Sequence, residues 1–355
     1  MAGDKAYPEA METFEVQAAS NQEPLRVDKF LLNLMYKVSR SRIQQAIEAK
    51  SVWVNGKEVK ANYKVRPKDV VRIDFPRYRP DETLIPEDIP LDVMFEDDDV
   101  LLINKPAGLV VHPGVGNWTG TLVNALMYRY KNLPTQQNDF VRDEESAKVD
   151  ASRAGIVHRL DKNTSGVMVV AKTPLGMKEL AQQFFDRTTH RRYYALVWGE
   201  TEDEGRIEGH IGRDLRNEKV YRIYKDGSHG KHAVTHYKTI ERFGYVSLVE
   251  CRLETGRTHQ IRVHMESISH PLFNDEKYGG DRIRKGTVYA KYKAFVHNAF
   301  KLCPRQALHA KELGFHHPRT GEYVLYDCPL PEDMQSVIDK WRDYMHHVLS
   351  KNLQP

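Results

Sequence analysis

The feature that most constrains this chain is an abrupt change of charge between residues 26–80 and residues 81–99. The first segment holds 14 Lys or Arg and five acidic residues, a net charge of +9, whereas the second holds nine acidic residues and no basic one. Pro86 and Pro90 fall in the acidic segment and disfavour regular structure there. Two adjacent blocks of opposite charge predict a small basic domain and a larger domain, joined by an acidic linker.

Composition limits the class of protein further. With 355 residues, 40% of them hydrophobic, the chain has enough apolar material for the cores of two domains. No stretch reaches the roughly 18 consecutive apolar residues of a membrane-spanning helix, so we expect no membrane partner. Residues 1–20 lack the pattern of a secretory signal. Three widely spaced cysteines favour a reducing compartment. We therefore expect a cytoplasmic protein, and we expect a monomer.

The basic segment, residues 26–80, has the pattern of two helices followed by a small sheet. Asn55-Gly56 lies between two short β-rich runs and predicts a hairpin. Apolar side chains at helical spacing predict the helices, and they are Val27, Phe30, Leu31 and Met35, then Ile43, Ala46 and Ile47. Basic side chains accompany both elements. This combination predicts a compact domain that binds a polyanion.

The order of these elements resembles an S4 RNA-binding domain over about residues 26–75. The resemblance is carried by residues 25–31, 39–42 and 52–56. It implies an RNA partner, contacted by basic side chains that include Arg40, Arg42, Lys57 and Lys60. A basic surface with no special function is the alternative that charge alone leaves open.

Residues 155–172 carry the most informative polar cluster. Apolar runs on both sides of a polar turn predict a strand, a turn and a strand. Asp161 follows Arg159 by two residues, and a carboxylate beside a guanidinium stays ionised. An ionised carboxylate can act as a nucleophile. By itself, however, this pattern more often marks a structural ion pair.

Four segments together resemble pseudouridine synthases of the large-subunit rRNA type, and they follow the family's order along the chain. These segments are residues 104–114, 158–166, 191–199 and 253–264. The resemblance spans about residues 91–330. It implies an α+β fold, with a mixed, largely antiparallel sheet and a central cleft, preceded by the small S4-like α+β domain. Outside these domains we expect an N-terminal tail (1–25), the acidic linker (81–99) and a C-terminal helix (331–355).

The resemblance also implies the chemistry. Such enzymes detach uracil from its ribose, turn it and rejoin it through C5, without redox change or a group donor. We therefore expect no cofactor and no metal ion. Asp161 matches the essential aspartate, Arg262 the arginine that pairs with it, and Tyr193 the tyrosine that stacks on the target base.

Four further residues are expected to contact the substrate. Arg159 matches the arginine that fills the space left when the target uridine flips out of the RNA, and Ile261 is expected to line the pocket. His158 and Thr164 lie in the same motif. The chain departs from the family at Asn274, where glycine is frequent, but Asn tolerates the left-handed conformation better than most residues.

The implied substrate is large-subunit rRNA, and two alternatives remain. The same domain could modify tRNA, or the chain could be a non-catalytic RNA-binding factor in ribosome assembly. The presence of Asp161, Tyr193 and Arg262 argues against the second alternative, because a protein that only binds RNA does not need a nucleophile.

Overall fold

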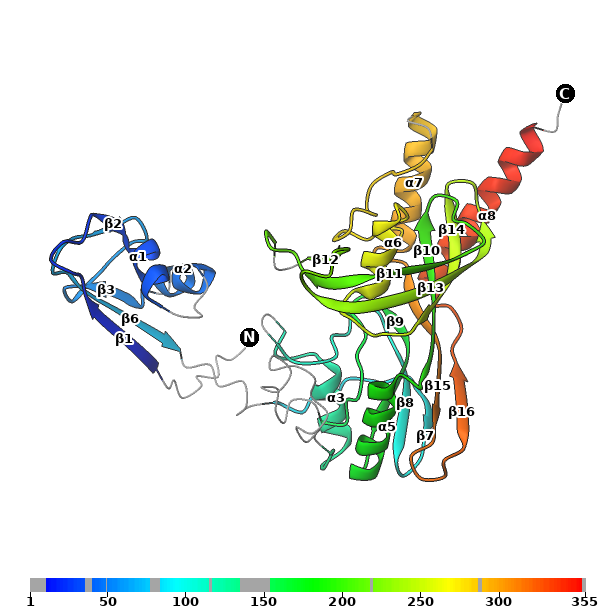
Figure 1. Ribbon diagram of the computed structural model, residues 1–355, viewed down its shortest axis with the longest axis horizontal. Helices are drawn as coiled ribbons and strands as arrows, with labels where there is room; N and C mark the ends of the chain where they lie inside the picture. Colours follow the sequence, from blue (N-terminus) through cyan, green and yellow to red (C-terminus); the bar gives the residue numbers. More distant parts are fainter. Residues whose placement is uncertain are drawn as a thin grey trace. The chain divides into compact units, whose positions relative to one another are not determined.

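The computed structural model describes residues 11–35, 40–48, 50–76, 84–114, 117–134, 154–217, 220–286 and 289–352. The chain forms two compact units, Met1–Glu82 and Thr83–Pro355, each with its own core (Figure 1). The boundary between them falls at the start of the acidic segment. Within the described ranges, no helix combines the length and the apolar character needed to cross a membrane.

The first unit packs two helices against a four-stranded antiparallel sheet of order β1-β6-β3-β4. Its elements are β1 (Met11–Gln17), β2 (Leu25–Arg26), α1 (Val27–Leu34), α2 (Arg40–Glu48), β3 (Val52–Val54), β4 (Lys57–Glu58), β5 (Lys64–Val65) and β6 (Val70–Pro76). Asn55 and Gly56 have φ angles of 50° and 77°, and they join β3 to β4 as predicted. The predicted helical stripes are buried in the core, namely Val27, Phe30, Leu31, Ile43, Ala46 and Ile47.

Two segments differ from the sequence-based expectation. Residues 11–17, assigned to a tail, form β1 and pair along their whole length with β6. Phe14 and Val16 of this edge strand pack against the core, while Thr13, Glu15 and Gln17, which alternate with them, are exposed. The acidic composition of the segment obscured this strand pattern in the sequence. In the expected linker, residues 93–96 form a strand, and Leu84 and Leu91 pack against the core of the second unit.

The second unit is built on one mixed sheet of ten strands, in the order β12-β11-β13-β14-β10-β15-β9-β8-β7, with β16 paired to β15. Among the described residues, every neighbouring pair is antiparallel except β9 and β15, so the predicted largely antiparallel architecture is confirmed. The strands are β7 (Val93–Glu96), β8 (Val100–Lys105), β9 (Ser165–Ala171), β10 (His190–Trp198), β11 (Glu204–Arg213), β12 (Tyr221–Tyr224), β13 (Lys231–Arg242), β14 (Val246–Leu253), β15 (Leu308–His316) and β16 (Tyr323–Asp327).

The parallel contact between β9 and β15 sits beside the candidate site. Gly166 pairs with Ala310 there, and Ala310 also pairs with Tyr193 of β10. Gly166 has a φ of 120°, and a Cβ at this position would lie 2.2 Å from the Ala310 carbonyl oxygen. Only glycine allows so close an approach. β15 alone therefore separates β9, which follows the loop that holds Asp161, from β10, which carries Tyr193.

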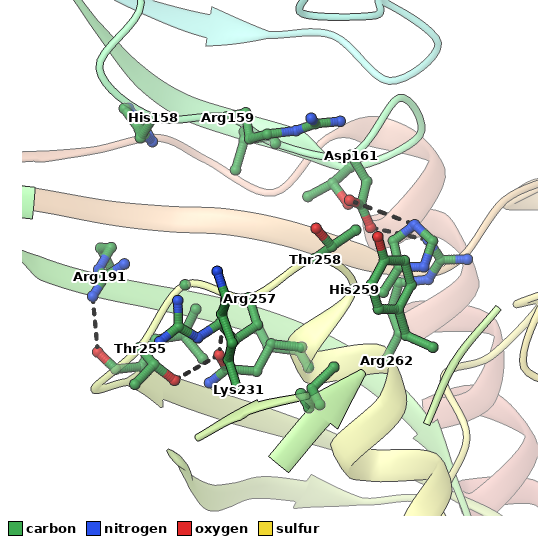
Figure 2. A pocket seen from close by; sticks show the side chains of 18 of the residues that line it. His158, Arg159, Asp161, Arg191, Lys231, Thr255, Arg257, Thr258, His259 and Arg262 are labelled. Carbon is green, nitrogen blue, oxygen red and sulfur yellow. Dashed lines mark hydrogen bonds and ion pairs between the residues drawn. The ribbon is translucent and has the colours of Figure 1, made fainter. Parts of the chain in front are cut away.

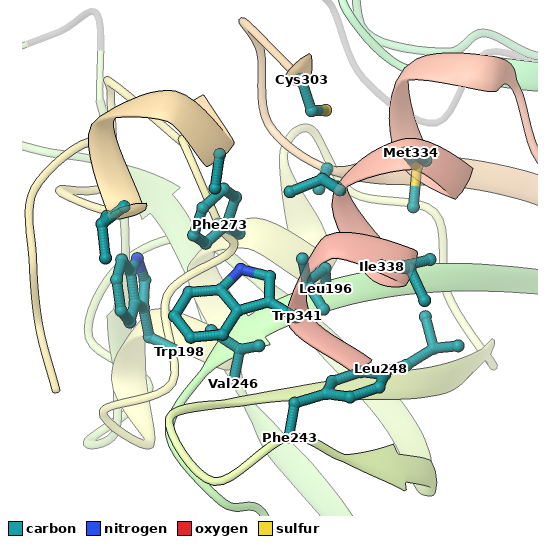
Figure 3. Close-up of a cluster of buried hydrophobic side chains, with 14 of the residues drawn as sticks. Leu196, Trp198, Phe243, Val246, Leu248, Phe273, Cys303, Met334, Ile338 and Trp341 are labelled. Carbon is teal, nitrogen blue, oxygen red and sulfur yellow. The ribbon is translucent and has the colours of Figure 1, made fainter. Parts of the chain in front are cut away.

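Helices cover the sheet, and the last of them completes a large aromatic core (Figure 3). They are α3 (Leu122–Arg129), α5 (Pro174–Asp186), α6 (Gln260–Ser267), α7 (Ala290–Leu302) and α8 (Glu332–Asn352). Trp341 of α8 is fully buried and packs edge-on against Trp198 and Phe273. Met334, Val337 and Ile338 of the same helix are buried beside it.

We predict that Trp341→Ala lowers the free energy of unfolding by about 3–5 kcal/mol, because it leaves a cavity in this core. Chemical denaturation monitored by circular dichroism measures the change. Trp341→Phe is the matched control and is expected to cost clearly less. Its ring fills most of the space, and the indole Nε1 has no hydrogen-bond partner among the described residues. Equal losses for the two variants would contradict the packing argument.

Candidate active site

Asp161 lies in a short loop directly before β9, and backbone hydrogen bonds fix that loop. The Asp161 carbonyl accepts from the Thr164 N–H at 3.0 Å, and the Lys162 carbonyl accepts from the Gly108 N–H at 2.8 Å. The ammonium of Lys105, which is fully buried, also donates to the Lys162 carbonyl at 3.2 Å. The loop is therefore held by contacts with the segment that follows β8.

A second buried cation, Arg305, holds the other end of the same loop. Its Nη1 donates to the Asn163 carbonyl at 3.0 Å, and its Nη2 donates to Ser165 Oγ at 3.2 Å. Its Nε donates to the Asp333 carboxylate, at the start of α8, at 2.6 Å. The C-terminal helix thus contributes to positioning Asp161, although it lies far from it in sequence.

The Asp161 carboxylate meets an arginine that is shared with a second carboxylate (Figure 2). Arg262 Nη1 donates to Asp161 Oδ2 at 2.9 Å, while its Nε and Nη2 donate to the two oxygens of Asp275 at 2.7 and 2.8 Å. The side chain of Asp275 is fully buried, whereas that of Asp161 is 19% exposed. Of the two carboxylates, Asp161 is therefore the one that a substrate can reach.

Electrostatics keep Asp161 ionised. Burial alone would raise the pKa of its carboxyl, but the neighbouring charges outweigh burial and hold the pKa below its usual value. His259 lies 3.9 Å from Asp161, and burial lowers the pKa of His259 to about 4. Since His259 is neutral at pH 7, the cations that stabilise the Asp161 carboxylate are Arg262, which contacts it directly, and Arg159.

Tyr278 supports both His259 and Arg262. Its hydroxyl is 2.7 Å from His259 Nδ1, and its ring centre is 5.0 Å from the Arg262 guanidinium. A guanidinium at this distance from an aromatic ring gains cation–π stabilisation. Tyr278 thereby fixes the orientation of the two side chains that face Asp161.

Tyr193 and Ile261 line the same pocket as Asp161. Tyr193 projects from β10, and burial raises the pKa of its phenol, with Arg191 opposing and Asp161 reinforcing this effect. Tyr193 is therefore protonated at pH 7. Ile261 is buried at the start of α6, directly before Arg262.

The pocket has a volume of about 710 Å³ and a strongly basic lining. This volume lies within the range of about 300–1,000 Å³ that is typical of small-molecule sites. Among the described residues that line it, Asp161 is the single acidic side chain. The basic ones are Arg159, Arg187, Arg191, Arg213, Lys231, Arg257 and Arg262. Such a lining suits a polyanionic substrate.

The remaining predicted substrate contacts line the pocket in different ways. Arg159 is exposed, and Thr164 is buried with a hydroxyl that has no partner among the described residues. His158 accepts the Val169 N–H through Nε2 at 3.0 Å, and its ring stacks on Phe184. Burial lowers the pKa of His158 to about 3. His158 is thus a neutral part of the wall, and its Nε2 is already occupied.

The predicted RNA-binding residues lie in the first unit. Lys57 and Lys60 are exposed, beside the hairpin turn and just after it. Arg40 and Arg42 belong to α2, but their side chains lie outside the described part of the chain.

Comparison with known proteins bears on both units. The RNA pseudouridylate synthase family profile matches residues 99–267, and the S4 domain profile matches residues 25–71. A protein of Chlorobaculum parvum, described as an uncharacterized RNA pseudouridine synthase, is 44% identical over 91% of this chain and 96% of its own length. This chain belongs to the RNA pseudouridine synthase family.

As an RNA pseudouridine synthase, the chain is an isomerase of RNA with an N-terminal S4 domain. The ribosomal large subunit pseudouridine synthase D of Nitrosomonas europaea is 40% identical over 96% of this chain and 91% of its own length. The structure of human RNA pseudouridylate synthase domain containing 4 covers 71% of this chain and 93% of its own, with a TM-score of 0.51 and 22% identity. This likeness shows a shared fold.

Three residues in contact with Asp161, its loop or its arginine partner were not singled out from the sequence of this pseudouridine synthase. Lys105, His259 and Asp275 support the Asp161 loop or its arginine partner. Lys105 carried a weak signal, because it ends an apolar strand and precedes a proline. His259 and Asp275 lie within segments that resemble the family, but nothing local distinguishes them from other polar residues there.

We predict that Lys105 makes the stability of the enzyme depend on pH. Burial and the nearby charge of Arg305 lower the pKa of Lys105 to about 7, against about 10.4 in an unfolded chain. Between these values the unfolded chain binds a proton that the folded protein has lost. The free energy of unfolding should therefore rise with pH across this window, relative to Lys105→Met. Urea denaturation at several pH values tests this, and parallel curves for the two proteins would refute it.

Proposed function

We propose that this enzyme isomerises specific uridines of large-subunit rRNA, with Asp161 as the nucleophile and with the target uridine flipped into the pocket. The observation that carries the proposal is an ionised carboxylate, Asp161, that shares a pocket with Tyr193 and is the single acidic side chain among the described residues that line it. The reaction breaks the N1–C1′ bond and forms the C5–C1′ bond. N1 gains a proton and C5 loses one.

Asp161 has the properties that the first step needs. Its carboxylate is ionised, exposed to the pocket on one side and held by Arg262 on the other. The bonds of Lys105 and Arg305 to the loop backbone fix its position without using the carboxylate oxygens. A preorganised charge of this kind reacts without a large rearrangement of its surroundings. Attack on the ribose and formation of a glycal both use this same group.

Tyr193 is suited to stacking on the detached base. Its phenol is protonated at pH 7, because burial and Asp161 raise its pKa. A protonated phenol offers a flat apolar face and a hydrogen-bond donor, and it is a poor base. This favours a role in holding uracil while it turns over a role in removing the C5 proton.

Base flipping would be favoured by Arg159. Extruding a nucleotide costs a few kcal/mol, because stacking and pairing are lost. Arg159 is exposed beside Asp161, and a guanidinium can stack on the bases that remain and meet phosphates. These contacts recover part of the cost.

Two observations support large-subunit rRNA as the substrate. The relatives of Nitrosomonas europaea and Zymomonas mobilis, 40% and 41% identical, are both described as ribosomal large subunit pseudouridine synthase D. The first unit matches the S4 domain and exposes Lys57 and Lys60. A separate basic domain adds phosphate contacts at a distance from the reacting uridine, which suits a large structured RNA.

We predict that cells without this protein lack pseudouridine at defined large-subunit rRNA positions. The wild-type protein should restore them, and Asp161→Asn should not. In vitro, Asp161→Asn should bind RNA but release tritium from 5-labelled uridine slower by roughly three orders of magnitude or more, since the amide cannot act as nucleophile. Asp186→Asn, an exposed change at the end of α5, is the control.

Turnover of Asp161→Asn near the wild-type rate would remove Asp161 from the mechanism. Loss of pseudouridine from tRNA alone, with rRNA unchanged, would favour the tRNA alternative.

We predict that the first unit contributes affinity rather than chemistry. It carries the basic segment of net charge +9 and none of the residues that line the pocket. Each phosphate neutralised by Lys or Arg contributes roughly −0.7 to −0.9 to the slope of log affinity against log salt concentration. Deleting residues 1–82 should therefore weaken rRNA binding and flatten this slope. A short uridine-containing RNA should still be converted at high concentration. Unchanged affinity and slope would show that this unit is not needed for binding.

A further inference from the structure

Arg191 projects into the pocket from the same strand as Tyr193 (Figure 2). The two residues are two positions apart on β10, so their side chains lie on the same face of the sheet, about 7 Å apart along the strand. Figure 2 shows Arg191 in a part of the pocket away from Asp161. A single nucleotide whose base meets Tyr193 can therefore also reach Arg191 with its backbone.

The guanidinium of Arg191 has little compensation from the protein. Among the described residues it makes one hydrogen bond, from Nη2 to the Leu253 carbonyl at a long 3.4 Å, and its Nε is enclosed without a partner. No described carboxylate forms a salt bridge with it. Burial, together with the like charge of Arg187, lowers the pKa of Arg191 despite an opposing effect of Tyr193.

The next residue on the strand shows the contrast. Arg192 points to the opposite face and pairs with Glu250 at 3.0 Å and with Glu312 at 2.5 Å. Arg262, in the same pocket as Arg191, has two carboxylate partners. Removing a cation from water without an anion is unfavourable. Arg191 is half-buried, unlike the exposed Arg159 and Arg187, and the described part of the chain gives it no carboxylate partner.

Two contacts hold the Arg191 guanidinium at the wall of the pocket. The Phe184 ring centre lies 5.9 Å from the guanidinium on one side. On another side is Gly256, where a Cβ would come within 2.9 Å of Arg191 Nη1. The guanidinium thus lies in the pocket between the Phe184 ring and the backbone of Gly256. The exposed cation Arg187 lines the same pocket.

We propose that Arg191 is a phosphate-binding residue, which binds the non-bridging oxygens of a phosphodiester next to the target uridine. A phosphodiester is the anion that an RNA strand in this pocket brings with it, and arginine binds such oxygens through paired N–H donors. The contact would hold the nucleotide at its backbone while its base is detached and turned at Tyr193. This inference rests on the proposed function and names a subsite of the same pocket.

The test combines a protein variant with a modified substrate. Short RNAs carry one neutral methylphosphonate at the linkage either 5′ or 3′ of the target uridine, and kcat/KM is measured for wild type and Arg191→Gln. One linkage should lower kcat/KM of the wild type by about 10- to 100-fold, the range expected for a hydrogen bond to a charged group. Arg191→Gln should lose a similar factor on unmodified RNA and lose little more on the modified one.

Arg252→Gln is the matched control. Arg252 is exposed, lies directly opposite Arg192 in the sheet and does not line the pocket, so this variant should respond to methylphosphonate as the wild type does. Circular dichroism verifies folding, and Arg191→Met replaces Arg191→Gln if the latter does not fold. If Arg191→Gln remains as sensitive to both linkages as the wild type, or if the wild type is sensitive to neither, the phosphate subsite is refuted.

The dissociation constants of the same oligonucleotides are measured alongside. A chain that binds RNA but makes no pseudouridine would refute the proposed function, while its binding data would still show whether Arg191 and the phosphate are coupled. A chain that isomerises uridine with no such coupling would refute the subsite alone.

Discussion

The site depends on one guanidinium that serves two carboxylates. Arg262 is buried, and a buried cation is tolerated only where anions compensate it. Asp275 does so with both oxygens and is itself held by the backbone N–H groups of Lys277 and Tyr278. Because Asp275 occupies Nε and Nη2 of Arg262, the remaining nitrogen, Nη1, is available to donate to Asp161. The neutralisation of Arg262 and the ionised Asp161 that the proposed mechanism requires thus depend on the same interaction.

The sheet supplies the second constraint, because the catalytic candidates come from separate parts of the chain. Asp161 precedes β9, Tyr193 lies on β10 and Arg262 lies on α6. They meet because β15 lies between β9 and β10, with Gly166 close against Ala310. Asn274, directly before Asp275, adopts the left-handed conformation with a φ of 57°. Its side-chain amide donates to one backbone carbonyl at the end of α7 and to another just after that helix. The turn that carries Asp275 therefore keeps its shape without glycine.

Charge is used differently in the two units of the enzyme. In the first unit, lysines such as Lys57 and Lys60 stay exposed, where salt screens them and where they attract a polyanion without selecting a sequence. In the second unit, Lys105 and Arg305 are buried outside the pocket lining and hold backbone carbonyls, whereas a different set of cations lines the pocket. Basic composition alone cannot separate these uses, because they differ in burial and in partners.

The sequence by itself determined the local elements and the identity of the main candidates. The helical stripes that begin at Val27 and the Asn55-Gly56 turn depend on neighbours a few residues away, so they could be predicted, and the motif around Asp161 pointed to the family. The alternation in β1 was present but hidden by acidic residues. Only the tertiary structure decided that Asp275 shares Arg262, that His158 supports the wall, and that no described carboxylate pairs with Arg191. These facts follow from sheet register and burial, which bring together residues as far apart in sequence as Asn163 and Arg305 and which no local pattern encodes.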